Sequence, residues 1–121
     1  MTFTRIEMSA ITKLALAMAN ADGKIEKSEL NYIALELARF GVRDCEPIID
    51  GANEMDGSDA LSIVAKMTDE EKKYVAAYLG TVMAVDNDID EKELALWRLT
   101  STLCGLPTMN ILEAIEYVKN I

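Results

Sequence analysis

The stretch Ala21-Asp-Gly-Lys-Ile-Glu-Lys-Ser-Glu29 decides the organisation of this chain. A second version of it, Val85-Asp-Asn-Asp-Ile-Asp-Glu-Lys-Glu93, follows 64 residues later. The repeat extends outward, because Gly41 corresponds to Gly105 and the apolar stripe before each turn is also matched. The stripe residues are Ile11, Leu14, Ala15 and Met18 in the first copy, and Val75, Tyr78, Leu79 and Val82 in the second. The sequence therefore predicts two copies of one helical hairpin, each presenting an acidic turn.

Length and composition predict one all-α domain. The chain has 121 residues, 50% of them hydrophobic, and only two prolines. A chain of this length can bury a substantial core. Ala, Leu, Met, Glu and Lys, which lose little rotamer freedom in a helix, dominate the composition. We expect a single-domain bundle of about seven helices with a pseudo-twofold internal duplication, in which residues 4–42 and 68–106 form the repeat halves and residues 108–120 a last helix.

The charge balance restricts the classes of partner. The formal net charge is −9, whereas nucleic-acid binding depends on Lys and Arg that neutralise phosphates. We therefore expect no nucleic-acid partner and no attraction to an anionic membrane, and we expect cations or a basic protein surface instead. No apolar run approaches the ~20 residues of a membrane span, so a soluble, cytoplasmic protein with reduced Cys45 and Cys104 is the default expectation.

Caps and apolar spacing place the helices. The first is expected at about 4–20, the second from Glu26 to Gly41, and two short helices before Thr68. The Thr68…Glu71 capping box opens a long fifth helix to about residue 85, and Asp90 opens the sixth, which ends at Gly105. On the second helix we expect a buried stripe of Leu30, Ile33, Ala34, Leu37 and Phe40, and on the sixth helix we expect apolar packing from Leu96, Leu99 and Leu103. Ser58 or Asp59 is expected to cap the fourth helix. Tyr32, Tyr74 and Tyr117 are candidate surface residues.

The two turns supply six candidate metal ligands. Each copy has an Asp in the turn and a Glu about one helical turn later, and the full set is Asp22, Glu26, Glu29, Asp86, Asp90 and Glu93. Two carboxylates about 5 Å apart repel by about 3 kcal/mol at an effective dielectric constant of about 20, and a cation removes that repulsion. Oxygen ligands favour Ca²⁺, Mg²⁺ or Mn²⁺. We expect no organic cofactor.

Other interpretations of the turns stay open. The acidic residues suit plain helix capping, especially Glu26 and Asp90. An EF-hand is disfavoured, because Met18 and Asn20 stand where its opening ligands belong. The module is alternatively a protein-interaction domain without metal. A Mg²⁺- or Mn²⁺-dependent hydrolase is chemically allowed, but the chain has no histidine and shows no substrate-binding signature, so we expect no enzyme.

The repeated pattern resembles a known family. The motif Ala-Asp-Gly-x-Ile-x-x-x-Glu after an Ala-rich helix, repeated as Val-Asp-x-x-Ile-x-x-x-Glu, is similar to the TerB-like domains of tellurite-resistance proteins and of some DnaJ-type co-chaperones. The resemblance implies a seven-helix fold, a stress-response role and an acidic metal-binding patch. Its candidate ligands are Asp22, Glu29, Asp86 and Glu93. Asn87 replaces the glycine of the first copy, which makes the second turn a less faithful match.

Overall fold

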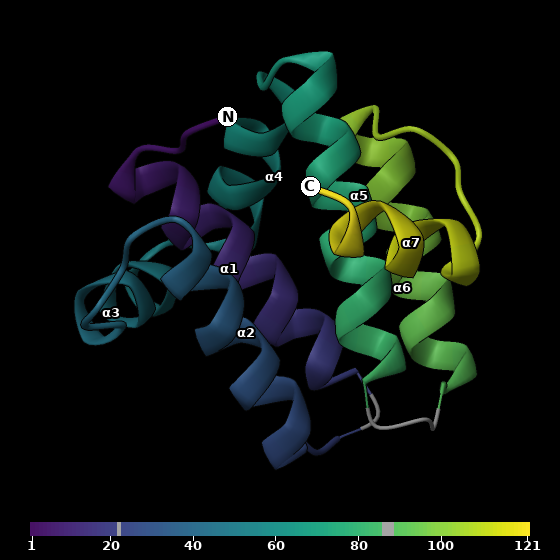
Figure 1. Ribbon diagram of the computed structural model, residues 1–121, viewed down its shortest axis with the longest axis horizontal. Helices are drawn as coiled ribbons and strands as arrows, with labels where there is room; N and C mark the ends of the chain where they lie inside the picture. The colour runs from purple at the N-terminus through teal and green to yellow at the C-terminus, as the bar shows by residue number, and fades with distance from the viewer. Residues whose placement is uncertain (22, 86–88) are drawn as a thin grey trace.

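The computed structural model describes residues 1–21, 23–85 and 89–121, and these ranges form an all-α single-domain bundle (Figure 1). This confirms the predicted fold class. The helices are α1 (Arg5–Ala19), α2 (Lys27–Arg39), α3 (Glu46–Glu54), α4 (Gly57–Ala65), α5 (Asp69–Ala84), α6 (Glu91–Cys104) and α7 (Ile111–Lys119). None of the described helices combines the length and apolar character that a membrane crossing requires.

Local hydrogen bonds fix the helix ends. Thr4, Thr68 and Asn110 each form a capping box with the glutamate three residues later, which satisfies amides that have no partner inside the helix. Gly105 ends α6 in the left-handed conformation, with φ +68°, where glycine carries no Cβ penalty. The cap of α4 differs from the predicted Ser58 or Asp59. Asp56 is the cap and accepts a hydrogen bond from the Asp59 amide at 3.1 Å, so the helix begins two or three residues earlier than expected.

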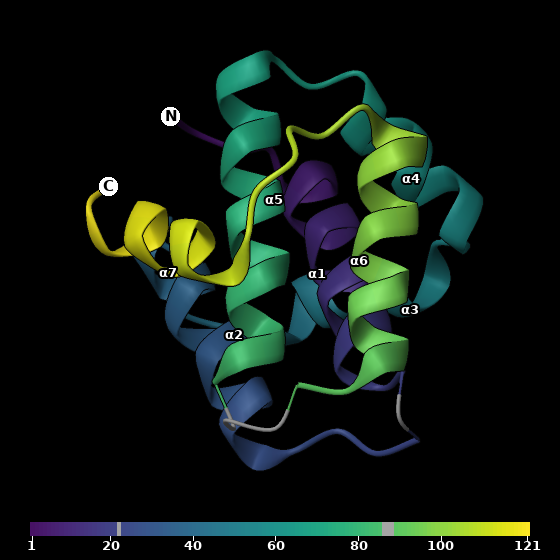
Figure 2. The ribbon, with the colours of Figure 1, turned by 90° about the vertical axis from the view of Figure 1, so that its right-hand side faces the viewer.

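Helix α5 forms the centre of the bundle. Residues 74–83 are all buried, as expected for a helix with neighbours on most sides. Helices α1, α2, α6 and α7 all pack against it, whereas α3 and α4 pack mainly on α1, with α4 also touching α6 (Figures 1 and 2). The predicted stripe of α1, Ile11, Leu14, Ala15 and Met18, is buried. The predicted surface position of Tyr74 is wrong, since Tyr74 is 1% exposed.

The buried face of α2 differs from the one predicted. Ile33 and Leu37 are buried, but Leu30 is 46% exposed and Ala34 is also exposed. Glu29 and Glu36 complete the buried face instead. The reason is geometric: among the described helices, α2 packs mainly on α1 and α5, and those two helices set the direction of its buried face.

The buried face of α6 also differs from the one predicted. Its buried face consists of Glu93, Trp97, Thr100 and Cys104. Leu99 and Leu103, expected to supply apolar packing, are more than half exposed, and α6 packs on α5, α4 and α1 through a different face. Trp97 and Ile33, which are equivalent in the repeat, are both buried. This equivalence agrees with an internal duplication, while the pseudo-twofold relation itself stays a prediction.

Candidate metal site at the two corners

The helix ends that flank the α1–α2 and α5–α6 connections, which we call the two corners, lie at the same end of the molecule. The C-terminal ends of α1 and α5 and the N-terminal ends of α2 and α6 all lie there in both ribbon views (Figures 1 and 2). The hairpins also contact each other, because α1 packs on α5 and α6, and α2 packs on α5. The fold therefore brings Glu26 and Glu29, at the start of α2, and Asp90 and Glu93, at the start of α6, to one end of the bundle, which is the arrangement that a shared site requires.

Two of the predicted ligands are buried carboxylates. Glu29 and Glu93 are each only 1% exposed, although each belongs to the first turn of its helix. The Oε1 atom of Glu29 accepts a hydrogen bond from the backbone N–H of Glu26 at 2.8 Å. A buried carboxylate loses hydration and is stabilised by hydrogen bonds or nearby positive charge. Burial at the same repeat position in both hairpins distinguishes these two glutamates from ordinary surface acids.

Glu26 and Asp90 occupy the N-cap positions of α2 and α6, as the sequence indicated. The Oδ1 atom of Asp90 accepts a hydrogen bond from the Lys92 amide at 2.7 Å. Both residues are half-buried. One Asp90 oxygen is thus engaged in capping.

The remaining two predicted ligands, Asp22 and Asp86, lie outside the described residues, as does Asn87. Within the described ranges, no group of three or more Asp, Glu or Cys side chains is close enough to hold a metal ion. A complete site therefore needs the turn aspartates in addition to Glu29 and Glu93. The chemistry of such a set is limited to carboxylate oxygen, which suits hard divalent cations.

A third buried carboxylate was missed at the sequence level. Glu36 is 1% exposed and accepts a hydrogen bond from the Tyr74 hydroxyl at 2.7 Å. It also forms an ion pair with Arg39 at 3.2 Å, one turn later on α2. The signal was available, because Glu36 lies between Ile33 and Leu37 on the same helical face. This network ties α2 to α5 behind the corners.

The tyrosines around Glu36 are strongly perturbed. Burial, reinforced by the hydrogen bond to the Glu36 carboxylate, raises the pKa of Tyr74 far above its usual value. Burial is also the main reason that the pKa values of Tyr32 and Tyr78 are raised. Tyr74 meets Tyr78 edge to face at a centroid separation of 5.7 Å, and Tyr78 meets Tyr32 at the same separation. These rings remain neutral and act in packing and hydrogen bonding.

The two cysteines are free thiols. Cys104 is buried, and burial raises its pKa, whereas Cys45 is half-buried.

No protein-family model and no curated protein matched this chain. Among solved structures, it is similar to the crystal structure of PG1108, a protein of unknown function from Porphyromonas gingivalis W83. The two share 48% sequence identity and a TM-score of 0.87 over 99% of this chain and 92% of that one. The chain belongs to the same family as PG1108. The two proteins therefore share one fold over nearly their full compared lengths.

Proposed function

We propose that this protein is an acidic binding module that takes up a divalent cation, Ca²⁺, Mg²⁺ or Mn²⁺, at the end of the bundle where α2 and α6 begin. The observation that carries the proposal is the burial of Glu29 and Glu93, each 1% exposed at equivalent positions of α2 and α6. The similarity of the repeated motif to TerB-like domains supports it further. A stress-response role rests on that resemblance alone.

Electrostatics gives the physical reason. The chain has 21 acidic and 12 basic residues, and two of the acidic side chains are withdrawn from water at one end of the bundle. Carboxylates in such surroundings favour either proton uptake or a cation. One hard divalent ion neutralises several carboxylates at once. The turn residues Asp22 and Asp86 would complete its set of ligands. Glu29 and Glu93 are fixed on helices, which gives the site two rigid oxygen donors.

A melting experiment tests the proposal. Thermal unfolding is followed with EDTA and with CaCl₂, MgCl₂ or MnCl₂ at millimolar concentration. A ligand at about 100 times its Kd stabilises the folded state by about 2.7 kcal/mol, so at least one metal should raise the Tm by several degrees. The Asp22→Asn/Asp86→Asn double variant should lose that rise.

The matched control is Asp50→Asn/Glu54→Gln, which removes two negative charges from exposed positions on α3. This variant should keep the metal-dependent rise in Tm. A wild-type protein whose Tm responds to none of the three metals would refute cation binding, and so would equal responses of the two double variants.

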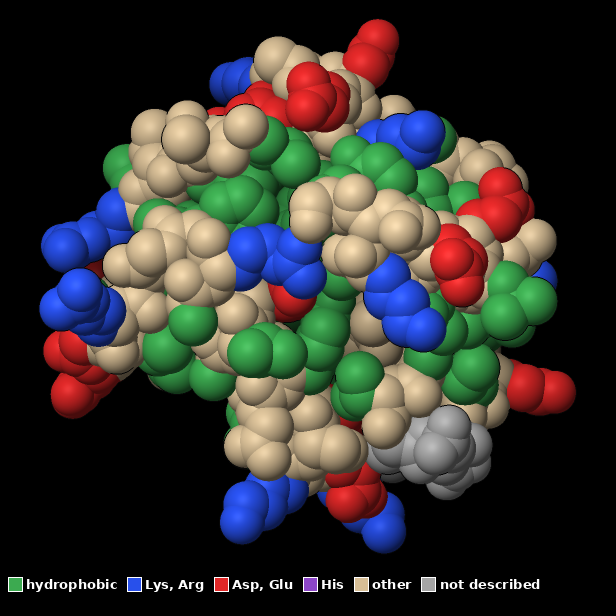
Figure 3. Space-filling model, viewed as in Figure 1, with side chains coloured by type: hydrophobic (Ala, Val, Ile, Leu, Met, Phe, Trp, Pro, Cys, Tyr) green, Lys and Arg blue, Asp and Glu red, His purple; other side chains and the backbone are tan. Residues whose placement is uncertain are grey.

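The second candidate is a protein-interaction module without metal. The net charge of −9 favours it, since an acidic surface attracts basic partners. Figure 3 shows acidic and basic side chains interspersed on the face viewed there, so this face has no single-sign patch. The interaction module predicts salt-sensitive binding to a basic peptide that EDTA leaves unchanged, whereas the cation module predicts a metal-dependent Tm.

A further inference from the structure

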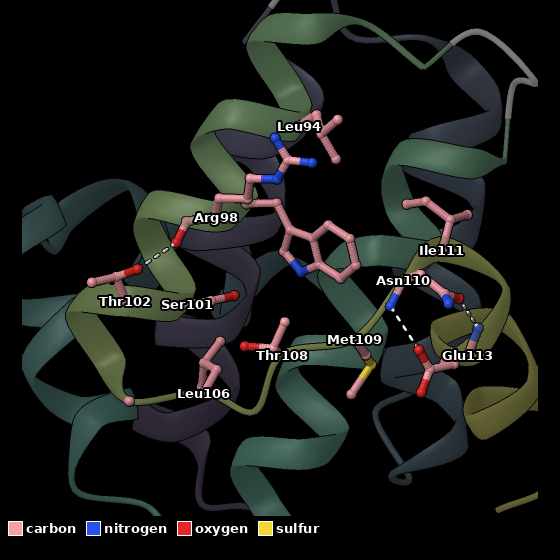
Figure 4. A pocket seen from close by; sticks show the side chains of 12 residues that line it. Leu94, Arg98, Ser101, Thr102, Leu106, Thr108, Met109, Asn110, Ile111 and Glu113 are labelled. Carbon is pink, nitrogen blue, oxygen red and sulfur yellow. Dashed lines mark hydrogen bonds between the residues drawn. The ribbon is translucent and has the colours of Figure 1, made fainter.

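A groove of about 880 Å³ lies along α6, between this helix, the α6–α7 connection and the start of α7 (Figure 4). Its volume falls within the ~300–1,000 Å³ typical of small-molecule sites. None of the four candidate metal ligands that the structure describes, Glu26, Glu29, Asp90 and Glu93, lines it. The groove is therefore a feature separate from the corners, and what it binds does not depend on the proposed cation site.

The floor of the groove is apolar. Trp97, Leu94, Met109 and Ile111 line it and also pack against the core. The indole N–H of Trp97 is already used, because it donates to the carbonyl of Ala76 at 3.0 Å. The ring is 5% exposed, so only a small part of it faces the groove, and the partly buried Leu94, Met109 and Ile111 supply most of the apolar surface. The hydrogen bond to Ala76 holds the ring in place.

The groove also contains a cation. Arg98 lies on the α6 side and is exposed (Figure 4). In the described part of the chain its guanidinium forms no ion pair, although the protein is strongly acidic. Glu113 lies across the groove, on α7, and its Oε1 accepts from the Asn110 amide at 3.1 Å (Figure 4). The two charged side chains are thus separated, and the groove has a cationic side and an apolar floor.

We propose that this groove binds a small amphipathic carboxylate. The guanidinium of Arg98 pairs with the carboxylate, for which its planar fork of N–H donors is well suited. The apolar body of the ligand lies on Trp97 and Met109. The hydroxyl of Ser101, one turn along α6 from Arg98, also lines the groove and adds a polar group to its wall. The glutamate across the groove orients the ligand, because it repels the carboxylate toward Arg98.

The chain carries its own reporter. Trp97 is its single tryptophan and lines the groove, so any change in indole emission comes from the surroundings of this residue. The probes are octanoate and 1-octanol, which share an alkyl chain but differ in head-group charge. Calorimetry gives the affinity, and fluorescence at the same concentrations gives the location. We expect octanoate to bind with a change in Trp97 emission and 1-octanol to bind at least several-fold more weakly.

Two arginine variants complete the test. Loss of a charged hydrogen bond that is partly exposed to water lowers affinity by about tenfold or more. Arg98→Gln should therefore weaken octanoate binding by that factor and leave the affinity for 1-octanol unchanged. Arg43→Gln, an exposed arginine outside the groove, should bind octanoate as the wild type does. Equal affinities for the two probes, equal affinities of the two variants, calorimetric binding without a fluorescence change, or no binding of octanoate would each overturn the proposal.

Discussion

Gly80, in the middle of the central helix, offers a sharp test of the packing. A Cβ added at Gly80 would lie 2.7 Å from the Cζ2 atom of Trp97 on α6 and 2.9 Å from the Cβ of Ala114 on α7. Neither atom is the end of a flexible side chain. The Trp97 ring is also anchored by its hydrogen bond to the Ala76 carbonyl, so it cannot move aside without weakening that bond.

The expected magnitude follows from two opposing contributions. Alanine in place of glycine inside a helix gains about 1 kcal/mol of helix propensity. Overpacking costs about 1–3 kcal/mol, and a strained Trp97 hydrogen bond adds about 1 kcal/mol. Gly80→Ala should therefore lower the free energy of unfolding by about 1–3 kcal/mol. For a domain of this size that corresponds to a fall in Tm of roughly 4–12 °C.

Urea unfolding followed by circular dichroism and by Trp97 fluorescence measures the effect. The matched control is Gly57→Ala at the start of α4, where an added Cβ meets nothing within 4 Å. This control should be neutral or slightly stabilising. The packing argument would be refuted by a Gly80→Ala protein as stable as the wild type, or by equal destabilisation in the two variants.

Three further predictions concern buried polar groups and caps. Tyr74→Phe removes the hydroxyl that donates to Glu36 and should destabilise the fold by about 1.5–3 kcal/mol, measured by urea unfolding at pH 7. The pKa values of Tyr32, Tyr74 and Tyr78 are raised in the fold, so the free energy of unfolding should be unaffected by these groups below pH ~10. Above that pH the unfolded chain ionises first, and the free energy of unfolding should fall by up to about 4 kcal/mol per pH unit for the three together. Tyr78→Phe should reduce the slope of the urea-derived free energy against pH by about a third, and an unchanged slope would contradict the assignment. Thr68→Ala, which removes the side-chain acceptor of the α5 capping box, should cost about 1 kcal/mol in the same assay, and full stability would argue against the cap.

Helix positions followed from the sequence because their determinants are local. The cap at Thr68 and the terminating Gly105 act within a few residues, so their chemistry is legible without any tertiary contact. The stripe of α1 was also correctly predicted, since its apolar residues leave one choice of buried face. Glu29 and Glu93 were identified as special from their repeated spacing.

The sequence alone did not decide which way α2 and α6 turn in the bundle. Hydrophobicity predicts that Leu30 lies on the buried face of α2, yet Glu29 is buried and Leu30 is 46% exposed. A shift of one residue rotates a helix face by about 100°, and the choice depends on where α1 and α5 lie. The apolar pattern of α2 is weak enough for those neighbours to override it.

Sites formed between helices were likewise decided by tertiary structure. No residue near Arg98 in the sequence indicates that it lines a groove. The groove forms because the α6–α7 connection folds back beside α6. The need for a small residue at Gly80 comes from Trp97 and Ala114, which pack against it from α6 and α7. Spacing and caps are short-range properties written along the chain, whereas burial and grooves depend on surfaces that meet only when distant segments pack.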